Sequence, residues 1–263
     1  MKFRLKVSGS HLLASFAILA IVLGSLYFGW YRWPGWYLTS AKRVIAILVT
    51  VDAALGPFLT LLIANPAKPR RELVRDIGVI VAVQVLALAY GTATLWHGRP
   101  LYYTFSEDRL QLVQASDLSV AEIERARLEN PTFAPYWYSR PRWVWAPLPD
   151  DPAARRQIVQ SALHAGDDVI QMPRYFRSWE AGLPTLRSKL LPVEAQPDVR
   201  FYRKKDRLRN RMIQLGFPGD APITMLMVGR SAPLLAVFDA GSLQIRAYLR
   251  SDFPLGARNS PLK

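Results

Sequence analysis

The chain has 263 residues, a formal net charge of +14 and no cysteine. The lack of cysteine excludes disulfides, thiolate metal sites and thiol catalysis. The only histidines, His11, His97 and His164, are so widely separated that a three-histidine metal site would need both ends of the sequence. Apolar residues make up 51% of the chain, but the long apolar runs are confined to the first hundred residues. We therefore expect a membrane region over residues 1–97 and a separate folded domain over residues 98–263.

Three apolar runs predict transmembrane helices over residues 12–30, 44–64 and 77–96. Each has about 20 residues, which is the length needed to cross a bilayer. A basic start followed by an apolar run is also typical of a cleavable signal peptide. The first run is too long for a signal core, however, and no small-residue cleavage site follows it. We therefore expect an uncleaved helix, with the aromatic-rich segment 27–37 as an interfacial belt.

The distribution of Lys and Arg predicts the topology. The N-terminal tail has three, the first loop three and the second loop four, and the tail and second loop share one side of the membrane. By the positive-inside rule that side is cytoplasmic. Three spans then place the C-terminal domain outside, which is the periplasm if the source is a Gram-negative bacterium. Because these charges flank apolar runs, they indicate topology and no nucleic-acid binding.

The central run combines a carboxylate, Asp52, with a Gly56-Pro57 pair. A charge at membrane depth costs at least ~2.5 kcal/mol, so such a residue indicates a functional or packing role. In a regular α-helix, Pro57 leaves the carbonyl of Ala53 without a donor, and a neighbouring helix or water must satisfy it. A purely structural alternative for Asp52 is a hydrogen bond to Gln84 on the third helix.

Small or polar residues recur at helical spacing on all three helices. They are Ala17, Ala20 and Gly24; Asp52, Gly56 and Thr60; and Gln84, Ala87 and Gly91. Such faces permit close helix packing in lipid. Two interpretations stay open: the faces pack the three helices together, or part of one is left for a partner's transmembrane helix. At the start of the third helix, Asp76 is expected to act as the N-cap.

A mixed α+β domain is expected after residue 98. We predict strands over 101–105 and 110–113, a helix over 120–128 that begins at a Ser119/Glu122 capping box, and a helix from Pro152 that buries Ile158, Val159 and Leu163. Residues 167–182 indicate a short strand and a turn. The basic run 203–211 could attract DNA or anionic lipid, but it is more typical of a solvated helix face. The chain ends in an antiparallel β-meander over 223–228, 234–238 and 243–249.

The segment 130–150 is rich in proline and aromatic residues, and its five prolines forbid a regular helix. The favoured interpretation is a long loop packed over the domain or on the membrane surface. A recognition site is the alternative, with Arg140 and Arg142 stacked on Trp143 and Trp145.

No known catalytic or cofactor motif is present. The chain lacks GxGxxG, GxxxxGK[ST], HExxH and GxSxG. The acid pairs Asp150-Asp151 and Asp167-Asp168 are more typical of caps and turns than of catalytic carboxylates. We therefore expect no enzymatic activity, no catalytic residues, no cofactor and no metal. A membrane sensor and a lipid or cell-wall enzyme with an extracytoplasmic domain are the alternatives.

Four segments resemble the TfpX/TfpZ family of type IV pilin accessory proteins. They are VDAALGPFLTLLIANP at 51–66, RRELVRD at 70–76, VIVAVQVLALAYG at 79–91 and RPLYYTFSEDR at 99–109. The resemblance implies an inner-membrane helper or chaperone that binds a pilin subunit and supports pilus assembly. Its implied partners are the pilin's transmembrane helix and head domain, membrane lipids and the assembly machinery. On this hypothesis Asp52, Gly56, Pro57 and Thr60 form the contact within the membrane.

Overall fold

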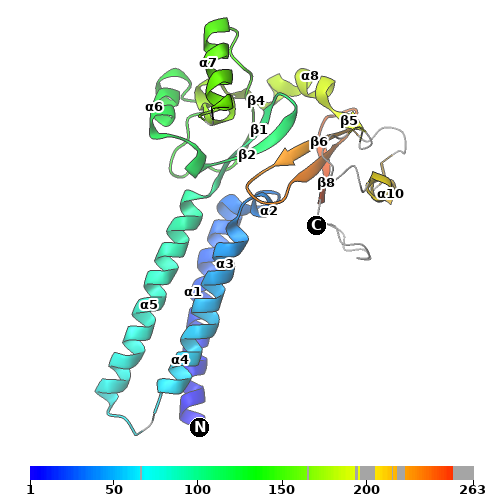
Figure 1. Ribbon diagram of the computed structural model, residues 1–263. Coiled ribbons are helices and arrows are strands. Elements are labelled where there is room, and N and C mark those ends of the chain that lie inside the picture. Colours follow the sequence, from blue (N-terminus) through cyan, green and yellow to red (C-terminus); the bar gives the residue numbers. More distant parts are fainter. Residues whose placement is uncertain are drawn as a thin grey trace. The chain divides into compact units, whose positions relative to one another are not determined.

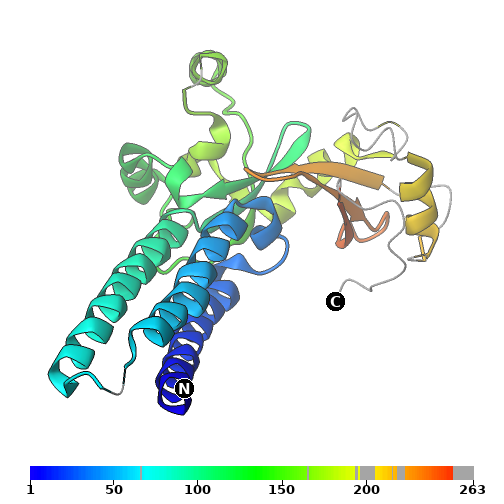
Figure 2. The ribbon, with the colours of Figure 1, turned by 60° about the horizontal axis from the view of Figure 1, so that its bottom comes forward.

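A computed structural model describes residues 1–65, 67–164, 166–192, 195, 205–214, 216–217 and 223–250 (Figures 1 and 2). The chain divides into a helical unit, Met1–Arg99, and an α/β unit, Pro100–Lys263. We describe each unit by itself. Of the predicted elements, part of the basic run 203–211 lies outside the described residues.

The helical unit contains three helices that are long and apolar enough to cross a membrane, as predicted. The first is α1 (Lys2–Leu26), which continues as the π-helix η1 (Tyr27–Tyr31). The short α2 (Gly35–Leu38) follows. The central helix consists of α3 (Ala41–Val49), the π-helix η2 (Thr50–Leu55) and α4 (Gly56–Ile63), and the third helix is α5 (Arg70–His97).

Two of these helices begin earlier than predicted. The first begins at Lys2 instead of residue 12, and α5 begins at Arg70 instead of residue 77. Lys and Arg are good helix formers, so the basic flanks extend the helices beyond their apolar parts. Asp76 is therefore an interior residue of α5 and not its N-cap, and its carboxylate pairs with Lys68 at 2.8 Å.

The helices pack closely at two glycines. A Cβ atom on Gly91 would lie 2.4 Å from Leu48 Cδ2, and one on Gly56 would lie 2.2 Å from Gln84 Nε2. The small residues of α1 behave differently: Ala17 and Ala20 are exposed, and a Cβ on Gly24 would meet no atom within 4 Å. The glycines of the central helix and α5 thus hold the helices together, while the small-residue face of α1 stays uncovered.

The aromatic segment after α1 turns partly inward. The Tyr31 hydroxyl donates to the Leu95 carbonyl at 2.7 Å, and Trp30 meets Trp96 edge to face at a centroid distance of 4.9 Å. Tyr37 is almost fully buried. This segment therefore joins the ends of the first and third helices, in addition to any role as a belt.

One sheet of eight described strands organises the α/β unit, in the order β4-β3-β1-β2-β6-β7-β8, with β5 also paired to β6. The strands are β1 (Pro100–Ser106), β2 (Arg109–Gln114), β3 (Arg142–Trp145), β4 (Arg177–Ser178), β5 (Leu191–Pro192), β6 (Ile223–Val228), β7 (Leu234–Phe238) and β8 (Ile245–Arg250). Pairs β1–β3 and β2–β6 are parallel. The predicted β1–β2 hairpin and the antiparallel β6–β7–β8 meander are confirmed.

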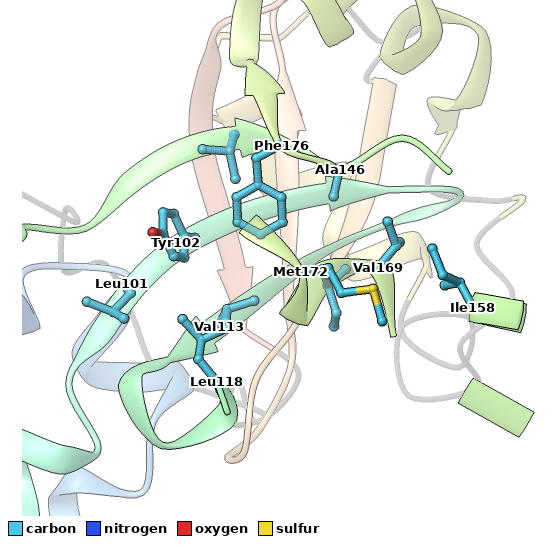
Figure 3. Packing of buried hydrophobic residues seen from close by; sticks show 11 residues of the cluster. Leu101, Tyr102, Val113, Leu118, Ala146, Ile158, Val169, Met172 and Phe176 are labelled. Atoms are coloured by element: carbon cyan, nitrogen blue, oxygen red, sulfur yellow. The ribbon is translucent and has the colours of Figure 1, made fainter. Parts of the chain in front are cut away.

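Described helices cover parts of this sheet. They are α6 (Val120–Glu129), α7 (Pro152–Leu163), α8 (Trp179–Lys189) and α10 (Lys205–Gln214), with 3₁₀ turns at Ala115–Asp117, Val169–Gln171 and Pro173–Tyr175. The main core joins strands β1–β3 to α7 and the 3₁₀ turns; its labelled members in Figure 3 are Leu101, Tyr102, Val113, Leu118, Ala146, Ile158, Val169, Met172 and Phe176. A smaller core packs Leu208 and Met212 of α10 on the meander.

Several local predictions in this unit need correction. Only Ile158 of α7 is buried, whereas Val159 and Leu163 are 42% and 78% exposed. The segment 167–182 does contain a short strand, β4, and two 3₁₀ turns, as predicted, but its last residues already begin the helix α8. Arg142 lies over the rings of Tyr102 and Phe133, at 5.4 and 5.1 Å, instead of the predicted tryptophans. Its neighbour Trp143 stacks on Tyr103 across β1–β3.

The contact between α8 and β3 gives a first prediction. A Cβ on Gly182 would lie 2.7 Å from Trp145 Cγ, so we expect Gly182→Ala to destabilise the α/β unit. Overpacking costs about 1–3 kcal/mol, of which alanine's better helix propensity offsets about 1. Denaturant unfolding of the full chain in detergent measures the change. The control is Gly241→Ala, whose Cβ would make only an ordinary 3.5 Å contact; equal losses in both variants would contradict the prediction.

Candidate functional site

The four residues predicted to form the membrane contact lie together on the central helix, and all four are buried. Asp52 is 4% exposed and Thr60 is 0% exposed, and Gly56 and Pro57 are buried between them. In this arrangement they face the neighbouring helices of the same chain. A direct contact with a partner's helix therefore stays a prediction, and it requires the helices to move apart.

The backbone around Asp52 forms a π-helix, which changes the consequence of Pro57. The Gly56 N–H donates to the Val51 carbonyl, five residues earlier. In that register the next donor, at position 57, belongs to the Asp52 carbonyl, but proline has no N–H. The Asp52 carbonyl is thus left without a backbone donor in this register, whereas the prediction for a regular α-helix concerned the carbonyl of Ala53.

Gln84 of α5 satisfies this carbonyl. Its Nε2 donates to the Asp52 backbone oxygen at 3.0 Å. The prediction that Asp52 and Gln84 interact is thus right about the residues, but the acceptor is the backbone oxygen instead of the carboxylate. Because any residue at position 52 offers a backbone carbonyl, this hydrogen bond does not depend on the aspartate side chain.

The other end of the Gln84 amide contacts the first helix. Gln84 Oε1 lies 2.8 Å from His11 Nε2, and His11 Nδ1 lies 2.6 Å from Thr60 Oγ1. Because Nε2 of Gln84 faces an acceptor, Oε1 is the atom that meets His11, and the ring donates through Nε2. In a neutral ring, Nδ1 then accepts from the Thr60 hydroxyl. One relay of hydrogen bonds therefore joins α1, α4 and α5.

A second bond ties α1 to the proline. The Ser8 hydroxyl donates to the Pro57 carbonyl at 2.7 Å. Ser8 and His11 lie one turn apart, on the face of α1 that packs on the central helix. Sequence reasoning missed both residues because they precede the first apolar run. The available signal was their spacing of three, which places two polar side chains on one face of a helix.

Gly56 makes room for the Gln84 amide. A Cβ there would lie 2.2, 2.4 and 2.6 Å from the Nε2, Cδ and Oε1 atoms of Gln84. Gln84 is itself 7% exposed and held by hydrogen bonds at both ends. Even a methyl group at position 56 would therefore force the amide away from its partners.

The Asp52 carboxylate is the one part of this cluster without a hydrogen bond. Neither of its oxygens, both buried, has a partner among the described residues. Buried polar atoms are nearly always paired, so this carboxylate is an exception within the cluster. The cluster offers one carboxylate and one imidazole in an apolar setting, and among the described residues no group of three or more His, Asp or Glu side chains is arranged to hold a metal.

Comparison with known proteins gives three relatives, all fimbrial assembly proteins of Dichelobacter nodosus. The serogroup I protein is 26% identical over 206 residues, which is 77% of either chain. The serogroup E1 protein is 26% identical over 78% of this chain and 82% of its own. The protein of serogroups C1 and C2 is 28% identical over 47% of this chain and 95% of its own. The chain is thus similar to fimbrial assembly proteins.

No protein-family model matches the chain. No solved structure matches it either. The two longer similarities each span more than three quarters of this chain, which is more than either structural unit contains. They therefore include parts of both the helical unit and the α/β unit.

The fit between Gly56 and Gln84 predicts a sharp difference between two glycines. Gly56→Ala should lower the stability of the helical unit by about 1–3 kcal/mol, because the new methyl group displaces an amide fixed at both ends. Gly78→Ala is the control, since a Cβ at that position of α5 meets nothing within 4 Å. Thermal unfolding in detergent gives the comparison, and an unchanged midpoint for Gly56→Ala would rule out this account of the glycine.

The role of the Gln84 amide is tested by a double-mutant cycle with Pro57→Ala and Gln84→Leu. Alanine at position 57 restores a backbone donor, so the loss of the Gln84 amide should cost less in that background. We expect a coupling of about 0.6–1.7 kcal/mol, the range for hydrogen bonds between helices in membranes. The loss of the His11 contact is common to both backgrounds and cancels. Gly78→Ala should be additive with Gln84→Leu, and additivity of Pro57→Ala as well would refute the role.

Proposed function

We propose that the chain is a membrane protein of pilus biogenesis that binds a type IV pilin subunit and supports its assembly. The similarity to fimbrial assembly proteins over most of the chain carries this proposal. The three helices long enough to span a bilayer support a membrane location. The finer assignment to the TfpX/TfpZ family, and the role of a pilin chaperone, belong to the same proposal.

The proposed orientation follows from the charges around the helices. Lys and Arg number seven in the N-terminal tail and second loop together, against three in the first loop. By the positive-inside rule the N-terminus is cytoplasmic, and the α/β unit lies in the periplasm across the inner membrane. A pilin awaiting assembly has a membrane helix and a periplasmic head. This topology offers a surface for each part on the correct side of the membrane.

We propose a binding role and no catalysis. The acid pairs that an enzyme would have used serve the backbone: Asp151 accepts from the N–H groups of Ala153 and Ala154 at the start of α7, and Asp168 accepts from Val169 N–H. These caps support the interpretation of both pairs as structural. A sensor or a lipid or cell-wall enzyme remains the alternative function, and no contact of these residues favours either.

Two routes exist for a pilin helix to reach the helical unit. The first uses Asp52, Gly56, Pro57 and Thr60 and needs a rearrangement, because all four are buried. The second uses the uncovered face of α1 with Ala17, Ala20 and Gly24, which permits close approach as it stands. We favour the second route for the first encounter, with Asp52 as the acceptor reached when the helices separate.

Co-purification of pilin with the full chain from detergent-solubilised membranes tests the proposal. Ala20→Leu adds bulk to the α1 face and should reduce pilin recovery severalfold. Ala82→Leu, at an exposed alanine of α5, is the matched control and should recover pilin as wild type does. Asp52→Asn keeps the shape and an acceptor oxygen and removes only the charge, so it should leave recovery intact on the favoured route, where the first contact is made by α1.

The possible results distinguish an error in the proposed binding route from an error in the proposed function. Loss of pilin with Asp52→Asn but not with Ala20→Leu would replace the α1 route with the buried one. Equal pilin recovery from all variants would indicate that pilin contacts the chain outside the helical unit. No pilin recovered with wild type, together with normal piliation in a deletion strain, would overturn the proposed function.

A further inference from the structure

A cluster of exposed aromatic rings lies between α6 and β3. Tyr136, Trp137 and Tyr138 are 41%, 71% and 59% exposed. The guanidinium of Arg127 on α6 lies 5.8 Å from the centre of the Tyr136 ring, and the next residue, Leu128, is 86% exposed. Large apolar side chains gathered on a surface mark a place where a partner or a membrane covers them.

The rings are held in place by a closed turn, Tyr136–Ser139, which we call the aromatic turn. The Tyr136 N–H donates to Ser139 Oγ at 2.9 Å, and the Ser139 N–H donates to the Tyr136 carbonyl at 3.1 Å. The rings of Tyr136 and Tyr138 stack at 5.7 Å, with Trp137 edge-on to Tyr138 at 5.5 Å. A preformed cluster of this kind loses little conformational entropy on binding.

The base of the segment that holds the aromatic turn is attached to the start of the sheet. The Tyr102 hydroxyl donates to the Phe133 carbonyl at 2.5 Å, and Arg142 Nη1 donates to the Thr132 carbonyl at 2.7 Å. Tyr102 is only five residues beyond His97, the last residue of α5. Because an extended chain spans at most ~3.6 Å per residue, Tyr102 lies within about 18 Å of the end of that helix.

From these observations we propose that the aromatic turn inserts into the bilayer interface, at the boundary of lipid headgroups and acyl chains. Trp and Tyr are the residues enriched at that depth, since their rings are apolar and their N–H or O–H groups meet water. The exposed cations Arg127 and Arg140 flank the turn and suit anionic lipid phosphates. The short tether from α5 brings the turn within reach of the surface. The inference rests on α5 spanning the membrane and is independent of pilin binding.

The insertion gives the α/β unit a second attachment to the membrane, besides its covalent link to α5. Rotation of the unit about that link is then restricted, and one side of it faces lipid. A protein partner on the aromatic turn is the competing occupant. The two occupants differ in one respect: lipid would bury the aromatic turn when the chain is alone in a bilayer, whereas a protein partner would bury it only when that partner is present.

The absence of cysteine allows a direct test with single-cysteine variants of the full chain in lipid nanodiscs. An environment-sensitive fluorophore is attached at Trp137→Cys, and separately at Tyr138→Cys, which keeps the tryptophan. The control is Leu163→Cys, because Leu163 is an apolar residue on α7 of the same unit and is at least as exposed as Trp137 and Tyr138. Quenching is measured with phospholipids that carry a nitroxide in the headgroup or high on the acyl chain, with and without phosphatidylglycerol.

We expect nitroxide lipids to quench the labels at 137 and 138 at least about twofold more than the label at 163, as for interfacial aromatic residues. Phosphatidylglycerol should increase the quenching at 137 and 138 further. Equal, weak quenching at all three positions would overturn the proposal. So would labels at 137 and 138 that change only when purified pilin is added, because the aromatic turn would then be a protein docking surface.

Discussion

The helical unit depends on one missing backbone donor. In the π-helix before Pro57, the Asp52 carbonyl has no N–H to accept from, and in apolar surroundings an unpaired carbonyl costs several kcal/mol. The Gln84 amide removes that cost. The local geometry of the central helix and the position of α5 therefore depend on each other. The Asp52 carbonyl can stay without a backbone donor only where α5 brings an amide to it.

The same amide extends the constraint to the first helix. A glutamine has a donor end and an acceptor end, and once the donor end faces the carbonyl, the acceptor end needs a donor of its own. His11 supplies this donor through Nε2, and its other ring nitrogen, Nδ1, then accepts from the Thr60 hydroxyl. Gly56 is needed for the same reason, because any side chain there would occupy the space of the Gln84 amide. Burial gives little drive for helix association in lipid, so such bonds and close contacts specify which helices pair.

Much of the fold follows from local patterns that sequence reasoning can detect. Three long apolar runs predict three helices, and alternating side chains around tight turns predict the β1–β2 hairpin and the meander. Helix α8 was missed because Gly182 and Pro184 interrupt its pattern: Pro184 stands inside the helix, where proline removes a backbone hydrogen bond. The exposure of Val159 and Leu163 was missed because helical spacing tells which residues share a face, but not whether anything covers it.

The polar cluster was predictable only in part, for a physical reason. Asp52, Pro57 and Gln84 stand out because polar residues and proline are rare in apolar runs. Ser8 and His11 lie in a polar tail, and their partners are 49 and 73 residues away in the sequence. The atom that Gln84 meets depends on the π register, and that register changes which carbonyl the proline frees. Because of this one-residue change of register, sequence reasoning identifies the interacting residues, Asp52 and Gln84, but not the atoms through which they interact.

Packing accounts unequally for the four residues expected to contact a partner. Gly56 makes room for an amide, Pro57 leaves the carbonyl that the amide satisfies, and Thr60 pairs with His11. Each is explained by contacts within the chain. The Asp52 carboxylate is not, because alanine at this position would offer Gln84 the same backbone oxygen. Sequences depart from local rules mainly at functional sites. Of the four residues, the aspartate is therefore the one for which we propose a role beyond holding the helices together.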